Sequence, residues 1–404
     1  MFKLQKMIRL VVFGFMLLSQ FALAQISIDT SFPGGNIVSE QLSGDTVYFK
    51  PDLRDTEGDW FYWYFRAVSN KPKTWYFKST QPNAMTGLGA VFSTDGGKEW
   101  QWIPRVNHHS EDLFSFTFTE HDQAIRFALA PPYTEANFAD FIKTYENDNR
   151  LKASVLCTSN KGREVEKLLI SQFDNKPKSK LLIVARAHAC EMMSSYVLEG
   201  IISSLLGSAP EMKLLLEQSE IQIIPFIDKD GVENGDQGKN RLPRDHNRDY
   251  NGESIYATTK TLRETVPKWV ENHPWVGIDL HNPWVKGEGN EWAYIVGNSD
   301  KKIEKAQRKF AEILIAESRG SIPLKMDNLF LAYGTSWNTG NNYSKGWSFS
   351  RWAASFADKG MKMSTTLEFP YALAYGKQIT PDKARAFGED FIFALAKFME
   401  EHVH

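Results

Sequence analysis

The chain has few cysteines and almost no net charge. Its 404 residues include only two cysteines, Cys157 and Cys190. Two thiols do not make the disulfide framework of a small secreted scaffold, and a chain of this length can bury its core without one. We expect both thiols to be free and buried, with a Cys157–Cys190 disulfide as the alternative. The formal net charge of −2 gives no electrostatic footprint for nucleic acid, so we expect no nucleic-acid partner.

Long hydrophobic runs are also scarce, and the one present lies at the N-terminus. Three basic residues precede an apolar run at 10–24, which ends in an A-x-A motif. This order is typical of a secretory signal peptide, here residues 1–24, whose removal would leave Gln25 first. An uncleaved anchor is the alternative. No later run reaches the roughly 18 apolar residues that a membrane helix needs. We therefore expect an exported protein, periplasmic or extracellular, with no membrane span after signal cleavage.

Residues 25–137 have no long helical patterns. Short runs alternate apolar and polar side chains, as in DTVYFKP at 45–51 and DLFSFTFTE at 112–120, and turn signals such as Asp95-Gly96-Gly97 separate them. Alternation with a period of two is typical of strands with one buried face. We therefore predict an antiparallel β-sandwich domain over this region.

Residues 138–404 alternate between strand patterns and helical patterns. The predicted strands lie at 180–187, 220–228, 275–282 and 363–370, and the predicted helices at 191–207, 257–273, 300–318 and 380–402. Thr380 and Pro381 suit the N-cap and first position of the last helix. Pro267 should kink or restart the second. This alternation predicts a three-layer α/β/α domain with a mixed, largely parallel sheet.

Polar side chains follow each of the four predicted strands. His188 and Glu191 follow the first, a loop rich in Gly, Asn and Arg at 229–250 follows the second, His281 ends the third, and Glu368 lies in the fourth. Ligands of open α/β sheets bind beyond the carboxyl ends of the strands. We therefore expect these side chains to converge on one edge of the sheet. Such convergence is stronger evidence for a functional site than any single residue.

Two histidines and a carboxylate with one open position form a standard catalytic zinc set. His188, Glu191 and His281 supply that set, and Glu368 would take the proton of a water that the zinc activates. The zincin signature H-E-x-x-H is absent. Singly, such residues are more often hydrogen-bonded histidines or surface carboxylates. Their convergence favours a site with one Zn²⁺ per chain.

Four motifs in this order resemble those of the zinc metallocarboxypeptidases, in particular the cytosolic-carboxypeptidase-like branch. The motifs are HACE at 188–191, DKDGVENGDQGKNRLPRDHNRDY at 228–250, GIDLHN at 277–282 and TTLEFP at 365–370. The likeness covers about 140–400. The aromatic-rich segment DWFYWYFRAVSN at 59–70 is similar to the β domain that precedes the catalytic domain in that branch.

The resemblance implies a role for each matching residue. His188, Glu191 and His281 would hold zinc, and Glu368 would act as general base and then acid. Arg241 would polarise the scissile carbonyl. Asn247 and Arg248 would bind the C-terminal carboxylate of a peptide substrate, and Asp245 would orient the first histidine. The alternative for the arginines is a solvated basic loop. The full list of implied site residues is His188, Glu191, Arg241, Asp245, His246, Asn247, Arg248, His281 and Glu368.

The chain departs from the family pattern in several places. Ala189-Cys190 stands where Pro-Gly is common, and we expect the Cys190 side chain to turn into the interior. His246 is an extra imidazole that would contact substrate or serve only as a loop residue. Asn282-Pro283-Trp284 replaces the small residues that usually follow the third ligand. The tyrosine that closes over substrate has no clear match, and Tyr333 and Tyr343 are the candidates.

The leading interpretation is an exported zinc carboxypeptidase that cleaves the last peptide bond of a peptide. The first alternative is a zinc amidase or deacylase acting on a small acyl-amino acid or a peptidoglycan stem. The second is a non-catalytic module that binds peptide or glycan through the aromatic N-terminal domain. The complete ligand set together with Glu368 disfavours the second. The sequence does not indicate an oligomeric state.

Overall fold

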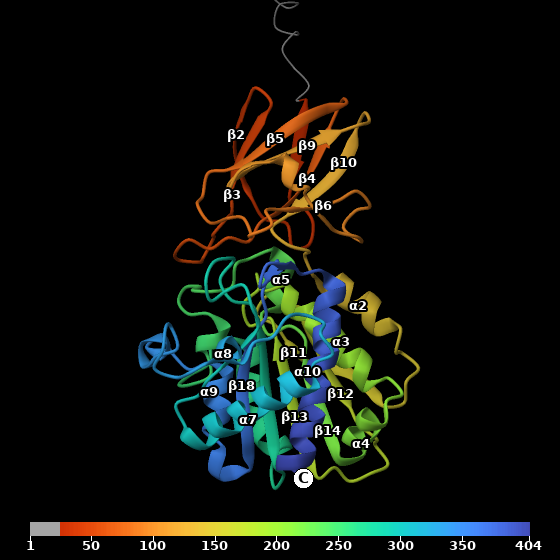
Figure 1. The fold of residues 1–404 in the computed structure, drawn as a ribbon, viewed down its shortest axis with the longest axis vertical. Coiled ribbons are helices and arrows are strands. Elements are labelled where there is room, and N and C mark those ends of the chain that lie inside the picture. The colour runs from red at the N-terminus through yellow and green to blue at the C-terminus, as the bar shows by residue number, and fades with distance from the viewer. Residues whose placement is uncertain (1–24) are drawn as a thin grey trace, which may run out of the picture.

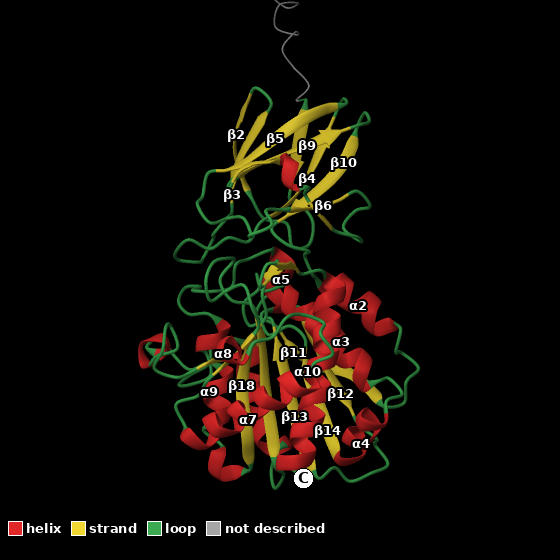
Figure 2. Ribbon diagram, in the orientation of Figure 1, coloured by secondary structure: helices red, strands yellow, loops and turns green. Residues whose placement is uncertain are grey.

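The computed structural model describes residues 25–404, which form two lobes (Figure 1). The upper lobe in that view is built from strands β1 to β10, and the lower lobe combines a large sheet with helices (Figure 2). The signal-peptide prediction falls on residues 1–24, outside the described residues. None of the helices over 25–404 is both long and apolar enough to cross a membrane.

The upper lobe contains two five-stranded sheets packed on an aromatic core. The first has the order β1 (Ile26–Asp29), β4 (Tyr64–Ser69), β10 (Gln123–Ala128), β6 (Val91–Ser93) and β7 (Gln101–Trp102). The second has the order β2 (Val38–Ser43), β3 (Thr46–Lys50), β5 (Lys73–Ser79), β9 (Leu113–Phe118) and β8 (His108–Ser110), beside the short helix η1 (Arg105–Asn107). All pairs are antiparallel except β3 with β5, which is parallel. Phe49, Trp63, Phe77 and Phe127 are fully buried between the sheets.

The lower lobe is organised around an eight-stranded mixed sheet. Its order is β11 (Leu151–Thr158), β12 (Glu164–Ile170), β14 (Ser219–Ile224), β13 (Ser179–Ala185), β15 (Trp275–His281), β18 (Met361–Glu368), β16 (Tyr294–Val296) and β17 (Phe330–Leu331). The four central strands, β14, β13, β15 and β18, run parallel to one another. Their carboxyl ends therefore lie at one edge, which faces the upper lobe (Figure 1).

Helices cover both faces of this sheet, because its central strands are apolar on both sides. In β13, Leu181 and Ile183 join the core under α3 and α10, whereas Leu182 and Val184 join a second core under α6 and α9. A continuous apolar run of this kind is typical of a parallel strand buried on both faces. The helices are α2 (Glu135–Lys143), α3 (Met193–Leu205), α4 (Pro210–Gln218), α5 (Lys229–Asn234), α6 (Ala257–Trp269), α7 (Lys301–Glu317), α8 (Met326–Leu329), α9 (Phe349–Ala354) and α10 (Pro381–His402). Short elements complete the lobe: η2 (His246–Arg248), η3 (Gly340–Tyr343), η4 (Ala357–Lys359), β19 (Leu373–Ala374) and β20 (Lys377–Gln378).

The predicted fold class is confirmed. Each of the four predicted strands and four predicted helices is present, and Thr380 caps α10 by accepting a bond from the Lys383 amide. Pro267 does not interrupt α6: it lies in the last turn, and the helix ends two residues later at Trp269. The domain boundary at 137/138, which falls within α2, stays a prediction.

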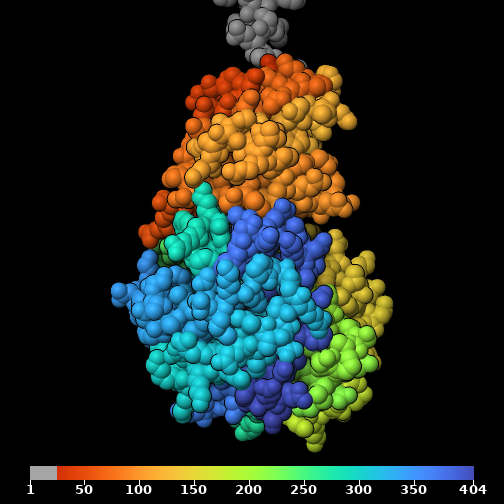
Figure 3. Space-filling view, viewed as in Figure 1, coloured from red at the N-terminus to blue at the C-terminus, as the bar shows by residue number. Residues whose placement is uncertain are grey.

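The two lobes touch over a broad front (Figure 3). The side-chain amide of Gln237, in the lower lobe, bonds both the amide and the carbonyl of Tyr62 at 2.8 Å. Asn36 donates to the carbonyl of Gly235 at 2.7 Å, and the indole of Trp102 donates to the carbonyl of Ile379 at 3.1 Å. The upper lobe is thereby fixed against the loops at the carboxyl edge of the sheet.

Candidate metal centre and substrate cleft

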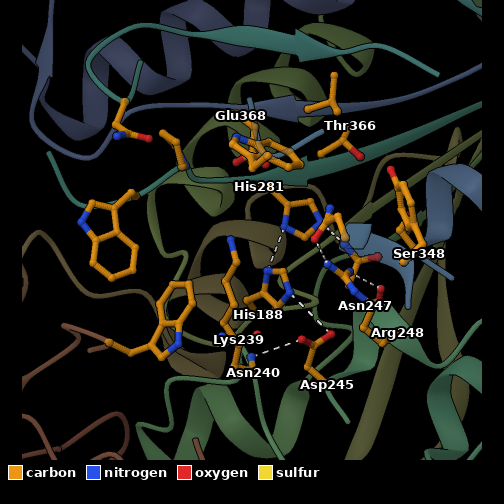
Figure 4. A pocket seen from close by; sticks show the side chains of 18 of the residues that line it. His188, Lys239, Asn240, Asp245, Asn247, Arg248, His281, Ser348, Thr366 and Glu368 are labelled. Atoms are coloured by element: carbon orange, nitrogen blue, oxygen red, sulfur yellow. Dashed lines mark hydrogen bonds and ion pairs between the residues drawn. The ribbon is translucent and has the colours of Figure 1, made fainter. Parts of the chain in front are cut away.

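His188, Glu191 and His281 converge on one point at the carboxyl edge of the sheet; both histidines are drawn in Figure 4. Nδ1 of His188 lies 2.8 Å from Oε1 of Glu191 and 3.1 Å from Nδ1 of His281. Nδ1 of His281 lies 2.6 Å from Oε2 of Glu191. All three side chains are buried. The structure thus brings together the three predicted ligands, while their binding of metal stays a prediction.

The turn between β13 and α3 places His188 and Glu191 on the same side. Arg186 enters this turn with a positive φ of 57°. Its buried guanidinium donates to the carbonyls of Tyr133 and Ala189, at 3.0 and 2.5 Å. A fixed guanidinium beneath the turn therefore holds the backbone that carries both side chains.

Buried carboxylates face the far nitrogens of both histidine rings. Nε2 of His188 lies 3.7 Å from Asp245, and Nε2 of His281 lies 2.9 Å from Asp279. Such partners fix the ring orientation and leave the other nitrogen, Nδ1, for a metal. Two imidazole nitrogens on oriented rings, together with a carboxylate, form a ligand set that fits Zn²⁺. Asp245 was anticipated from the sequence, whereas Asp279 was not.

Glu191 is ionised in this setting. Burial alone would raise the pKa of its carboxyl group, but the charges of His188, His281 and Lys239 outweigh burial and hold that pKa well below its usual value. An ionised carboxylate is the form that binds a metal cation.

Glu368 stands beside this trio. In the parallel pairing of β15 with β18, Glu368 is the register partner of His281, so both residues reach the same edge. Its side chain is buried, and among residues 25–404 its Oε2 atom has no hydrogen-bond partner. Burial raises the pKa of Glu368 to about 7, although Lys239 and His281 oppose the shift. The carboxyl group can therefore accept and return a proton near neutral pH.

A cleft of about 350 Å³ opens above these residues. Asn247 and Arg248 line it: the Asn247 side chain accepts a bond from the Phe349 amide at 2.9 Å, and Arg248 donates to the Asn342 side chain at 2.7 Å. Of the two candidate tyrosines, Tyr343 lines the cleft and Tyr333 does not.

Arg241 is not brought to the cleft, which corrects the position inferred for it. Its guanidinium forms ion pairs with Asp55 at 2.9 Å, Asp228 at 2.8 Å and Asp236 at 2.6 Å, and only 7% of its side chain is exposed. Burial opposes ionisation, but these three carboxylates outweigh it and raise the pKa of Arg241. Because Asp55 belongs to the upper lobe, Arg241 ties that lobe to the loop.

His246 is likewise turned away, so its inferred contact with substrate has no support in the structure. Its ring stacks on Tyr256 with 3.6 Å between centroids, and it does not line the cleft.

Cys190 is buried and free, as expected, and burial raises the pKa of its thiol to about 12. Cys157 is also free but only half-buried.

Among the cleft residues that the sequence did not single out are Lys239, from the loop after α5, and Trp60, from the upper lobe. Gly238 was the available signal for Lys239. A Cβ on Gly238 would lie 2.3 Å from the amide nitrogen of Ala189, so the loop packs directly on the turn that carries His188.

The family follows from comparison with known proteins. A model of the zinc carboxypeptidase family matches residues 139–371, more than half of the chain. The chain belongs to the zinc carboxypeptidase family. The resemblance drawn from the four motifs is therefore confirmed, and with it zinc as the cofactor, since the family is one of zinc enzymes.

Several curated relatives of this zinc carboxypeptidase family member are cytosolic carboxypeptidases. Cytosolic carboxypeptidase 6 of Mus musculus is 23% identical over 316 residues, which cover 70% of this chain and 57% of that protein. Cytosolic carboxypeptidase 3 of Bos taurus is 27% identical over 278 residues, which cover 60% of this chain and 27% of that protein. The chain thus spans about half the length, or less, of these relatives.

Solved metallo-carboxypeptidase structures share the fold of nearly the whole chain. A metallo-carboxypeptidase from Burkholderia cenocepacia has a TM-score of 0.74 at 18% identity, covering 93% of this chain and 99% of that one. One from Pseudomonas aeruginosa, solved with (2-guanidinoethylmercapto)succinic acid, has a TM-score of 0.71 at 18% identity with the same coverage. Coverage of this extent includes the upper lobe, which the family model, beginning at residue 139, does not reach.

Proposed function

We propose that this protein is a zinc-dependent carboxypeptidase that hydrolyses the C-terminal peptide bond of a peptide. One observation carries the proposal: His188, His281, Glu368 and Arg248 all line one cleft, and Glu191 lies buried directly behind the two histidines. Among residues 25–404, Oε2 of Glu368 has no hydrogen-bond partner. A metal, a base and a fixed cation for a carboxylate are the parts that this reaction needs.

Arg248 and Asn247 would bind the terminal carboxylate of the substrate. The guanidinium of Arg248 is held by the Asn342 side chain and by the Asn247 carbonyl, both at 2.7 Å, and it still lines the cleft. A planar, preorganised guanidinium suits bidentate binding of a carboxylate. Tyr343, whose ring lies 5.9 Å from the Arg248 guanidinium carbon, would cover the bound residue.

Glu368 would take a proton from the attacking water and return it to the leaving amine. The zinc ion, when bound, supplies a Lewis acid and lowers the pKa of water to roughly 7. Oε2 of Glu368 has no hydrogen-bond partner among the described residues, so no hydrogen bond to this atom has to break before it accepts the proton.

The remaining lining favours a neutral C-terminal residue. Apart from the groups assigned above and Lys239, the cleft is lined by uncharged side chains. Four of these are aromatic, Trp60, Trp284, Trp337 and Tyr294, and Val296 and Thr366 lie among them. An acidic or basic substrate side chain would lose hydration there without a free side chain of opposite charge to replace it. We expect release of apolar or aromatic residues from a mixed peptide library to exceed release of charged ones.

Replacement of Arg248 separates the carboxypeptidase from an amidase on the same scaffold. For Arg248→Ala we expect KM to rise at least about tenfold for peptides with a free C-terminal carboxylate, because a charge-assisted bidentate pair is lost. Arg308→Ala, which removes an exposed arginine of α7, is the matched control. An Arg248→Ala enzyme whose activity on peptides with a free C-terminal carboxylate is unchanged would favour the amidase. Chelation should abolish hydrolysis and Glu368→Gln should reduce it by several orders of magnitude, and activity that is unchanged by both would refute the zinc mechanism.

We also propose that the chain is exported, on the basis of the basic, apolar and small-residue order at residues 1–24. The relatives named above are called cytosolic, so the cellular compartment is a property in which this chain would differ from them. N-terminal sequencing of the native protein should begin at Gln25. An intact Met1 on the mature protein would count against cleavage of a signal peptide.

A further inference from the structure

Lys239 is held beside the candidate metal centre by the backbone that precedes it. The carbonyl of Gln237 accepts a bond from the amide of Cys190 at 3.0 Å, which joins the loop to the turn between His188 and Glu191. Gly238 follows with φ of 79° and lies so close to Ala189 that a Cβ would not fit. The next residue, Lys239, therefore starts beside the proposed ligands.

The ammonium group of Lys239 projects into the cleft beside His188 and toward His281 (Figure 4). It donates to Oε1 of Glu191 at 3.3 Å and lies 5.2 Å from the ring centroid of Trp60. A quarter of the side chain is exposed, so its ammonium group can still reach a ligand in the cleft.

Few cationic side chains line the cleft. Among the described residues that line the cleft, Lys239 and Arg248 are the only lysine and arginine. Arg248 is directed at Asn342, and Arg241, the residue that the family resemblance suggested, is neutralised by three aspartates outside the cleft.

We propose that Lys239 is a catalytic residue that stabilises the negative charge formed on the scissile carbonyl oxygen, a role that rests on the carboxypeptidase activity proposed above. As the water oxygen bonds to the carbonyl carbon, Glu368 takes the water proton and the C=O π pair moves onto oxygen. Lys239 donates a hydrogen bond to that oxygen and keeps its own proton. When the C–N bond breaks, the pair returns to re-form C=O, and the proton on Glu368 passes to the leaving amine.

Lys239→Met keeps most of the apolar side chain and removes the charge. We expect kcat to fall by roughly 10²–10³, the usual effect of losing one oxyanion donor, with KM nearly unchanged. The affinity for a phosphonate peptide analogue, whose tetrahedral anion resembles the intermediate, should fall in parallel. Zinc content and the Kd of a free amino acid product should stay nearly unchanged, and Lys239→Arg should recover part of kcat. Lys302→Met, an exposed lysine of α7, is the matched control.

The outcomes separate this inference from the carboxypeptidase proposal. Loss of zinc from Lys239→Met would mean that Lys239 only supports Glu191, and it would overturn the inference. So would an active wild type whose Lys239→Met variant keeps its kcat or its affinity for the phosphonate. A wild type that releases no amino acid, yet binds the phosphonate in a manner that depends on Lys239, would overturn the carboxypeptidase proposal and leave the anion site intact.

Discussion

Glu368 makes the activity depend on pH in a predictable direction. A general base works only when it is deprotonated, so kcat/KM should be retained above the pKa of Glu368 and lost as the pH falls through it. Burial raises that pKa to about 7, and the charge of a bound zinc ion would lower it. We therefore expect an acid limb with a midpoint at or below about 7, measured as kcat/KM against pH.

Two variants test whether this limb belongs to Glu368. Glu368→Gln should lose roughly 10²–10⁴ of kcat, since general base catalysis contributes about that factor. Glu312→Gln, an exposed carboxylate of α7, should keep both the activity and the limb. An acid limb that persists unchanged in the residual activity of Glu368→Gln would contradict the assignment.

Single residues were predictable where a strand fixed their position. His188, His281 and Glu368 lie at or just beyond the carboxyl ends of β13, β15 and β18, so strand patterns and the topology of an α/β sheet bring them together. Lys239 and Arg241 lie in a loop. Gly238, next to Lys239, packs on Ala189, and the Arg241 side chain pairs with Asp55; both partners are remote in sequence. Local patterns carry no information on such contacts, and the sequence therefore placed Arg241 in the cleft and overlooked Lys239.

At the scale of elements, the backbones of α3 and α10 touch through glycine. A Cβ on Gly388 would lie 2.1 Å from the carbonyl oxygen of Val197, and one on Gly200 would lie 1.9 Å from that of Arg385. Gly388→Ala should therefore force the helices apart. Overpacking typically costs about 1–3 kcal/mol, more than the gain of about 1 kcal/mol or less from alanine in a helix. We expect a lower free energy of unfolding, measured by urea denaturation.

Gly340→Ala provides the matched control, since the nearest atom to its new Cβ would be the Tyr333 hydroxyl at an ordinary 3.5 Å. Equal stability of the Gly388→Ala and wild-type proteins would mean that α3 and α10 separate without cost. Zinc content should be measured alongside, because α3 begins at Met193, just after the proposed ligand Glu191.

Helices and strands were predictable from the sequence where one face, or the whole element, is buried, because such burial leaves a regular pattern of apolar residues. The buried strand β13 and the capped helix α10 follow directly from apolar runs and from Thr380-Pro381. The strand β11 was not predicted, since it lies at the edge of the sheet and most of its side chains are exposed or half-buried. The parallel pairing of β3 with β5 was also missed, because strand patterns alone do not give the direction of a partner.

At the scale of the whole molecule, one continuous hydrophobic core runs through both lobes. It includes Phe77 of the upper lobe and Ile183 of β13 in the lower lobe. Between them, Phe61 packs on Trp284 with 5.0 Å between centroids and on Tyr371 with 5.5 Å. A shared core makes the folding of one lobe depend on the other, so we expect a single cooperative thermal transition by calorimetry.

Phe77→Ala tests this coupling from the far side of the molecule. Truncation of a buried phenylalanine costs about 3–5 kcal/mol, and Phe77 has no exposed surface. If the lobes unfold together, the temperature at which carboxypeptidase activity and zinc are lost should fall by several degrees, in step with the calorimetric midpoint. Val106→Ala, 84% exposed in the same lobe, should leave both unchanged. Two separate transitions, with the metal centre unaffected by Phe77→Ala, would mean that the lobes fold independently and that Trp60 reaches the cleft by docking alone.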